Sequence, residues 1–139
     1  MSLLLVDDEP VDIAVMQRSL ERAGYDILVA SNYDEALAQL TAHGSEIKML
    51  ITDISLPGRT GLDIARACLQ QQPELKVLFV SGWTGAEFLD YVGIRKEDLH
   101  FLPRPFRSSQ LISRVRKVAD STEQISWLDT DSDKAALGA

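Results

Sequence analysis

The sequence predicts a protein of the α/β class with a parallel sheet. Five short apolar runs, rich in leucine, valine and isoleucine, alternate with segments in which apolar residues recur at helical spacing. Apolar runs bounded by turn residues suit strands that are buried on both faces, as in a parallel sheet covered by helices. Regular alternation of strands and helices also favours right-handed crossovers within one sheet. We therefore expect five parallel strands with helices on both faces.

The five strands are expected where the apolar runs occur. The central one ends abruptly in an acid, Asp53, and a loop with Pro57 and Gly58 follows it. The predicted strands are residues 3–6, 27–30, 48–52, 76–80 and 99–102.

Helix-start signals lie between these strands. Pro10 follows three acids, which suits the first turn of a helix. Asn32, with Glu35 three residues later, resembles a capping box and predicts a second helix. A third helix must end before Pro73. Ser108 is expected to cap the last helix.

The region between the fourth and fifth strands is less regular. A short helix is expected from Thr84 to about Tyr91, whereas residues 93–98 are polar and carry no clear pattern. The last helix has apolar residues at helical spacing as far as Ala119. We therefore expect one domain over residues 1–120, followed by a polar, flexible tail over residues 121–139.

Composition narrows the function classes. The 139 residues are 45% hydrophobic and 25% charged, as expected for a globular protein. A net charge of −7 and the lack of a basic block argue against nucleic-acid binding. The single cysteine, Cys68, excludes an internal disulfide and fits a reducing compartment, so a cytoplasmic location is expected. The sequence has no apolar run long enough to predict a membrane span, and its first residues do not predict a secretory signal.

Polar side chains follow four of the predicted strands. Asp7 and Asp8 follow the first, Asp53 ends the third, Ser81 ends the fourth and Arg104 follows the fifth. In a doubly wound, flavodoxin-like strand order of 2-1-3-4-5, the first and third strands are neighbours at the topological switch point. The three carboxylates would then converge at the carboxyl edge of the sheet.

Such a cluster favours a divalent cation. Carboxylates held close together resist joint ionisation unless a cation joins them. Mg²⁺ commonly takes one or two carboxylates, keeps several waters and leaves room for a phosphoryl oxygen. Ser81 offers a hydroxyl to such an oxygen, and Arg104 offers positive charge. Together these groups make a plausible site for an aspartyl phosphate on Asp53.

With these residues in these positions, the chain resembles the receiver domain of two-component response regulators. The likeness covers about residues 3–119, and its specificity comes from the combined spacing of several motifs. The matching segments are Leu4–Pro10, Thr52–Asp53, Leu56–Gly58 with Gly61, Val80–Gly82 and Phe101–Phe106.

The resemblance implies a phosphoacceptor domain that is not a metabolic enzyme, although such domains assist their own phosphorylation and dephosphorylation. Asp53 would be phosphorylated by a histidine kinase or a histidine phosphotransfer protein. Mg²⁺ would be held by Asp8, Asp53 and the backbone carbonyl of Ser55, with Asp7 acting through water. Ser81 would follow the phosphoryl group.

The resemblance also implies a switch. Phe101 would change rotamer as Ser81 moves, altering the face made by the fourth helix, the fifth strand and the fifth helix toward a downstream protein. Dimerisation through the fourth and fifth helices stays open. So does the choice between a single-domain regulator and a fragment of a larger protein such as a hybrid histidine kinase.

One residue departs from the family pattern. The family normally has lysine where this chain has Arg104, and arginine is a planar fork with longer reach. Arg104 could pair with a phosphoryl group, or it could fold onto Asp53 and hinder it. The first alternative function is therefore a phosphorylation-independent interaction module. An aspartyl-phosphate hydrolase is a weaker alternative, because no second acid lies two residues after Asp53. A flavin-binding protein is weaker again, because the acidic first loop would repel a phosphate.

Overall fold

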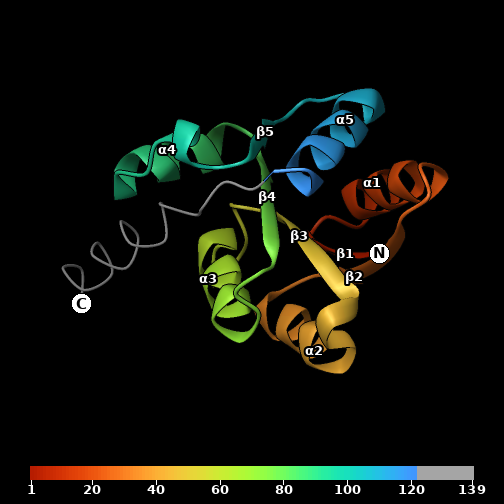
Figure 1. The fold of residues 1–139 in the computed structure, drawn as a ribbon. Coiled ribbons are helices and arrows are strands. Elements are labelled where there is room, and N and C mark those ends of the chain that lie inside the picture. Colours follow the sequence, from red (N-terminus) through yellow and green to blue (C-terminus); the bar gives the residue numbers. More distant parts are fainter. Residues whose placement is uncertain (122–139) are drawn as a thin grey trace.

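The computed structural model describes residues 1–121, except for the side chains of Trp83, Thr84 and Lys96. The predicted tail therefore lies outside the described residues from position 122 onward. Five parallel strands form one sheet in the order β2-β1-β3-β4-β5, which confirms the predicted fold class (Figure 1). The strands are β1 (Ser2–Val6), β2 (Asp26–Ala30), β3 (Ile47–Asp53), β4 (Lys76–Ser81) and β5 (Phe101–Pro103).

Helices cover both faces of the sheet. The α-helices are α1 (Pro10–Arg22), α2 (Tyr33–His43), α3 (Gly61–Gln71), α4 (Trp83–Val92) and α5 (Ser108–Ala119), and the 3-10 turns are η1 (Gly44–Glu46) and η2 (Lys96–Asp98). Figure 1 shows α1 beside α5 on one side of the sheet, with α2 and α3 on the other. In the described part of the chain, no helix combines the length and the apolar character that crossing a membrane requires.

Two apolar cores follow from this layering. Along β1, Leu3 and Leu5 point toward α1 and α5, whereas Leu4 and Val6 point toward the helices on the opposite face. All four side chains are fully buried. This explains why the strands are continuous apolar runs instead of alternating ones, because both faces of a covered parallel sheet exclude water.

The fifth strand is shorter than predicted. It begins at Phe101 and not at Leu99, because η2 brings the chain to the sheet edge only there. Leu99 is apolar because it packs against the core from outside the strand, and the His100 carbonyl already accepts a hydrogen bond from the Phe79 N–H at 2.9 Å. Burial of a side chain and strand pairing of its backbone are thus separate properties at this position.

Two predicted caps are partly wrong. Arg107, not Ser108, is the N-cap of α5, and the Ser108 hydroxyl lies 2.8 Å from the hydroxyl of Ser19 on α1. Tertiary packing of α1 against α5 has therefore taken the hydroxyl expected to cap the helix.

The cap of α2 is correct in its first half. Asn32 Oδ1 accepts from the Glu35 N–H at 2.9 Å, as expected of an N-cap. The Glu35 carboxylate accepts from the Ser31 N–H and hydroxyl, both at 2.8 Å, instead of reaching the Asn32 backbone. The box is displaced by one residue.

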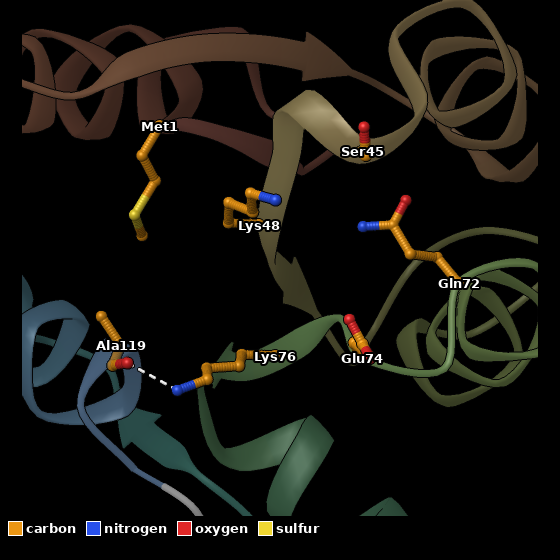
Figure 2. A pocket seen from close by; sticks show the side chains of 7 residues that line it. All are labelled: Met1, Ser45, Lys48, Gln72, Glu74, Lys76 and Ala119. Carbon is orange, nitrogen blue, oxygen red and sulfur yellow. Dashed lines mark hydrogen bonds between the residues drawn. The ribbon is translucent and has the colours of Figure 1, made fainter.

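A pocket of about 370 Å³ lies at the amino ends of the strands, away from the edge where Asp53 ends β3 (Figure 2). On its wall, Lys76 Nζ donates to the carbonyls of Ala119 and Ser121, at 2.5 and 2.6 Å. A cation is favourable beside the exposed carbonyls of a helix C-terminus. Lys76 therefore fastens the end of α5 to the start of β4.

We expect Lys76→Met to lower the free energy of unfolding by about 2 kcal/mol, because two charge-assisted hydrogen bonds to a helix end are lost. Lys48→Met is the matched control, because Lys48 lines the same pocket but is exposed. Urea denaturation measures both variants. Equal stability losses for the two would show that Lys76 does not hold α5.

Candidate functional site

The carboxyl ends of the inner strands meet at one edge of the sheet. Val6 pairs with Thr52, and Asp53 pairs with Val80. The residues that follow β1 and β3 therefore lie beside one another. The Arg104 N–H donates to the Ser81 carbonyl at 2.9 Å, which places the residue after β5 at the same edge.

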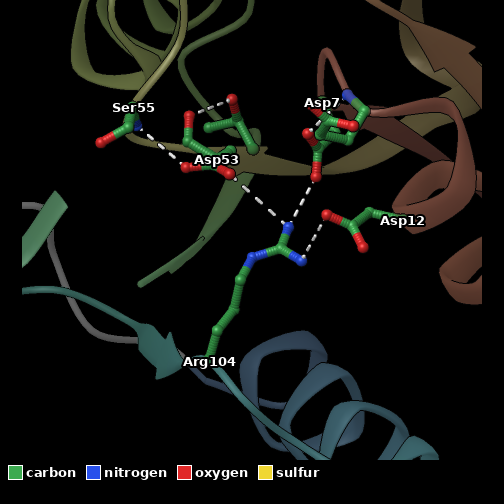
Figure 3. A network of polar contacts seen from close by, with 7 residues as sticks. Asp7, Asp12, Asp53, Ser55 and Arg104 are labelled. Atoms are coloured by element: carbon green, nitrogen blue, oxygen red, sulfur yellow. Dashed lines mark hydrogen bonds and ion pairs between the residues drawn. The ribbon is translucent and has the colours of Figure 1, made fainter. Parts of the chain in front are cut away.

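Arg104 is the centre of this edge (Figure 3). Its Nη2 atom lies 2.6 Å from Asp7 Oδ2 and 3.6 Å from Asp53 Oδ2. Its Nη1 atom lies 3.2 Å from Asp12 Oδ2 on α1. One guanidinium thus bridges three carboxylates, which come from the loop after β1, from α1 and from the end of β3.

Two of these carboxylates are removed from water. The side chain of Asp7 is 1% exposed and that of Asp53 is 14% exposed. Burial raises the pKa of both groups above its usual range. The Glu9 N–H and Arg104 oppose the rise in the pKa of Asp7, while the Ser55 N–H and Arg104 oppose it for Asp53.

Asp53 is held by its neighbours in a fixed orientation. Its Oδ1 atom accepts the Ser55 N–H at 2.9 Å, while Oδ2 faces Arg104. Gly61 packs against its backbone, since a Cβ atom there would lie 2.0 Å from the Asp53 carbonyl oxygen. The Gly61 N–H also donates to the Ile54 carbonyl at 2.9 Å. The start of α3 therefore fixes the loop that carries the carboxylate.

Two of the predicted metal ligands, Asp8 and Ser55, line a pocket that is open to solvent. Asp8 is exposed, and it lines a pocket of about 420 Å³ together with Ser55 and Thr60. Within residues 1–121, no three acidic, histidine or cysteine side chains form a ready cluster for a metal. Mg²⁺ does not need such a cluster, because it binds through one or two carboxylates and keeps its waters. The donors near the pocket, hard carboxylate and carbonyl oxygens, fit this chemistry.

Ser81 is buried beside the acids. Its side chain is part of the buried polar set, and its hydroxyl has no hydrogen-bond partner within the described part of the chain. The hydroxyl nevertheless lies near enough to Asp53 to lower the pKa of that carboxyl. Gly85 of α4 packs directly on it, because a Cβ at Gly85 would lie 1.8 Å from Ser81 Oγ.

Phe101 lies in the core between the sheet and the helices on the α2–α4 side. Arg114 of α5 donates from Nη1 to the Phe101 carbonyl. The backbone of β5 is thus tied to α5 at the residue that the sequence singled out as a switch. Whether Phe101 changes rotamer stays a prediction.

The structure adds functional candidates that sequence reasoning missed. Asp12 reaches Arg104 across 92 positions of sequence, and no local motif announces that contact. Gly85 is a close-approach position that looks like an ordinary helix glycine, and the close approach of Gly61, a residue already among the matching motifs, was likewise not expected. Thr60 could have been found, because it forms a capping box with Asp63, three residues later, at the start of α3.

Comparison with known proteins identifies the family to which the chain belongs. The family model for the response regulator receiver domain matches residues 3–116. The chain belongs to this family, whose members are signalling domains of two-component systems and interact with histidine kinases.

Individual relatives are moderately similar. The alkaline phosphatase synthesis transcriptional regulatory protein PhoP of Bacillus subtilis is 27% identical over 87% of this chain and 49% of its own length. The sensor kinase CckA of Brucella abortus is 28% identical over 88% of this chain and 13% of its own. The chain spans about half the length of PhoP and of the transcriptional regulatory proteins AruR of Pseudomonas aeruginosa and CpxR of Escherichia coli, at 48–49% of them.

Solved structures give the same fold. A response regulator receiver protein from Sinorhizobium medicae superposes with a TM-score of 0.75 at 27% identity, covering 88% of this chain and 97% of that one. The receiver domain of the hybrid histidine kinase CckA gives a TM-score of 0.70 at 26% identity, covering 86% and 100%.

We expect Asp53→Asn to raise the melting temperature by a few degrees at neutral pH. Because burial raises the pKa of Asp53, the native state holds its proton to higher pH than the unfolded chain does. Stability contributed by this group is therefore present near pH 4 and lost as the pH rises through the native pKa. The gain from Asn should shrink toward pH 4.

Thermal melts from pH 4 to pH 8 test this expectation. Asp26→Asn, which alters an exposed acid in β2, is the control and should show no such pH dependence. A pH-independent gain for Asp53→Asn would contradict the assigned cause.

We expect Gly85→Ala to lower the free energy of unfolding by about 1–3 kcal/mol, because the new methyl group collides with Ser81. The sign is informative, since alanine normally stabilises a helix interior relative to glycine. Gly82→Ala is the control, because a Cβ there meets open space. Chemical denaturation compares the two, and a stabilised Gly85→Ala protein would refute the contact.

Proposed function

We propose that this chain is a phosphoacceptor switch in which Asp53 takes a phosphoryl group from a phosphohistidine donor. The observation that carries the proposal is the position of the Asp53 carboxylate at the end of β3, between a guanidinium and a buried hydroxyl. Arg104 Nη2 stands 3.6 Å from it, and Ser81 is 1% exposed beside it. The adjoining pocket, lined by Asp8 and Ser55, offers an approach.

The reaction is a phosphoryl transfer between two nucleophiles. A carboxylate oxygen of Asp53 would form a bond to phosphorus as the phosphorus–nitrogen bond of the donor histidine breaks, and the imidazole leaves with its electron pair and takes up a proton. Charge builds on the phosphoryl oxygens in the transition state. The cation of Arg104 and the hydroxyl of Ser81 would stabilise that charge.

Mg²⁺ fits the remaining donors. Asp8, Asp53 and the Ser55 carbonyl would hold it, with Asp7 contributing through water. The ion supplies neutralising charge to the phosphoryl oxygens when it is bound. Asp7 is buried, Asp53 is partly buried, and burial raises the pKa of both, so a second cation beside Arg104 would be electrostatically favourable.

The output would be a change of binding surface. Ser81 would move toward the phosphoryl group, and Phe101 would respond in the face formed by α4, β5 and α5. The Arg114 bond to the Phe101 carbonyl supports a connection between β5 and α5. Residues 1–120 would form this module, with a histidine kinase or histidine phosphotransfer protein upstream and a downstream protein reading the surface.

One observation favours a second candidate, a phosphorylation-independent interaction module. Arg104 already pairs with Asp7 and Asp53, so the acidic site has an internal counter-ion. If that pairing persisted, neither a metal nor a phosphoryl group would be accommodated. The module would then act through its surface alone.

Intact-mass measurement after incubation with Mg²⁺ and acetyl phosphate or phosphoramidate tests the proposal. We expect one phosphoryl adduct on the parent protein, none on Asp53→Asn, and none when a chelator removes Mg²⁺. No adduct on the parent with either donor would overturn the proposal in favour of the interaction module. An adduct on Arg104→Lys alone would identify the arginine as the cause.

A further inference from the structure

Asp12 forms an ion pair with Arg104 that the proposed phosphoryl transfer leaves unexplained. It lies in the first turn of α1, outside the set of acids at the strand ends. Its Oδ2 atom is 3.2 Å from Arg104 Nη1, and its side chain is 45% exposed. A partly exposed pair of this kind contributes little to stability, so its significance lies in where it holds the guanidinium.

The two terminal nitrogens of Arg104 have separate partners. Nη1 serves Asp12, while Nη2 is shared by Asp7 at 2.6 Å and Asp53 at 3.6 Å. Arg104 Nε is buried and makes no hydrogen bond within the described residues. Neither buried acid therefore has the two-pronged contact that a guanidinium and a carboxylate prefer.

Asp12 supplies the ion pair of Nη1, and the remaining contact of the guanidinium beside Asp7 and Asp53 is the face of the Phe106 ring, 5.7 Å from its central carbon, which does not fix the direction of Nη1. Once released from Asp12, Nη1 could turn toward Asp53 or Asp7 and complete a two-pronged ion pair. Such pairs are strong in a poorly hydrated site. That closure would neutralise the acids with the protein's own cation. It would also occupy the carboxylate oxygens that a metal or a phosphorus atom must reach.

We propose that Asp12 is a positioning residue that holds Nη1 of Arg104 and so keeps the Asp53 carboxylate accessible to a divalent cation and a phosphoryl group. The inference rests on the proposed function. It also gives a reason for an arginine at position 104: the guanidinium places donors on two separate nitrogens, one for Asp12 and one for Asp7 and Asp53, whereas the donors of a lysine radiate from a single atom.

Mg²⁺ titration of four proteins tests the proposal without relying on phosphorylation. The proteins are the parent, Asp12→Ala, Arg104→Met and the double variant, and the readout is the NMR shift of backbone amides around Ser55. We expect Asp12→Ala to weaken Mg²⁺ binding about tenfold in the parent. In the Arg104→Met background it should weaken binding by no more than about threefold, because only distant Coulomb attraction is lost.

Control variants separate the effect of Asp12 on the position of Arg104 from the effect of the Asp12 charge on Mg²⁺. Glu21→Gln removes one exposed acid from the same helix and should leave Mg²⁺ affinity nearly unchanged. Asp12→Asn removes the charge but keeps an acceptor for Nη1, so its loss should be smaller than that of Asp12→Ala. If Asp12→Ala does not fold, as judged by its melting temperature, Asp12→Asn and its double variant take its place in the comparison.

The outcomes are distinct. Equal losses with and without Arg104 would overturn the inference, because Asp12 would then act by charge alone, and so would an Asp12→Ala protein that binds Mg²⁺ as well as the parent. Both results leave the proposed function standing if the parent is phosphorylated. A parent that neither binds Mg²⁺ nor accepts a phosphoryl group would overturn both.

Discussion

The shared contact of Arg104 with buried acids governs the chemistry at this edge of the sheet. Asp7 and Asp53 end or follow neighbouring strands, so the parallel register forces two carboxylates together where little water reaches them. Burial alone would favour their protonated forms. A single guanidinium from the loop after β5 compensates part of that cost, which ties the first and last thirds of the chain to the same few atoms.

Close backbone approach provides the second constraint. Gly61 lets α3 begin against the Asp53 carbonyl, and Gly85 lets α4 lie on the Ser81 hydroxyl. The backbone of Asp53 and the hydroxyl of Ser81 are therefore each packed against the first turn of a different helix. Movement of Ser81 could not occur without a response from α4, because interiors are close-packed. This contact offers a physical route from the proposed phosphorylation site to the surface formed by α4 and its neighbours.

Most of the fold was predictable because the strands are apolar on both faces. Each apolar run gave a strand to within about two residues, and the alternation with helices set a parallel sheet. The exceptions arise where tertiary contacts override local signals. Leu99 packs on the core although it lies outside the strand, and the Ser108 hydroxyl contacts Ser19 of α1, far away in the sequence, instead of capping α5. Such choices depend on neighbours that a local pattern does not contain.

The sequence by itself determined the class of fold, the family and the set of polar residues at the strand ends, since strand ends of a parallel sheet share one edge whatever the details of packing. Only the tertiary structure decided how those residues divide their contacts. Arg104 pairs through Nη1 with Asp12 and through Nη2 with Asp7 and Asp53. This division of contacts depends on the positions of α1 and of the loop after β5. Charges attract over distances of several ångströms, but their pairing is fixed by helix packing that brings residues 92 positions apart within 3.2 Å.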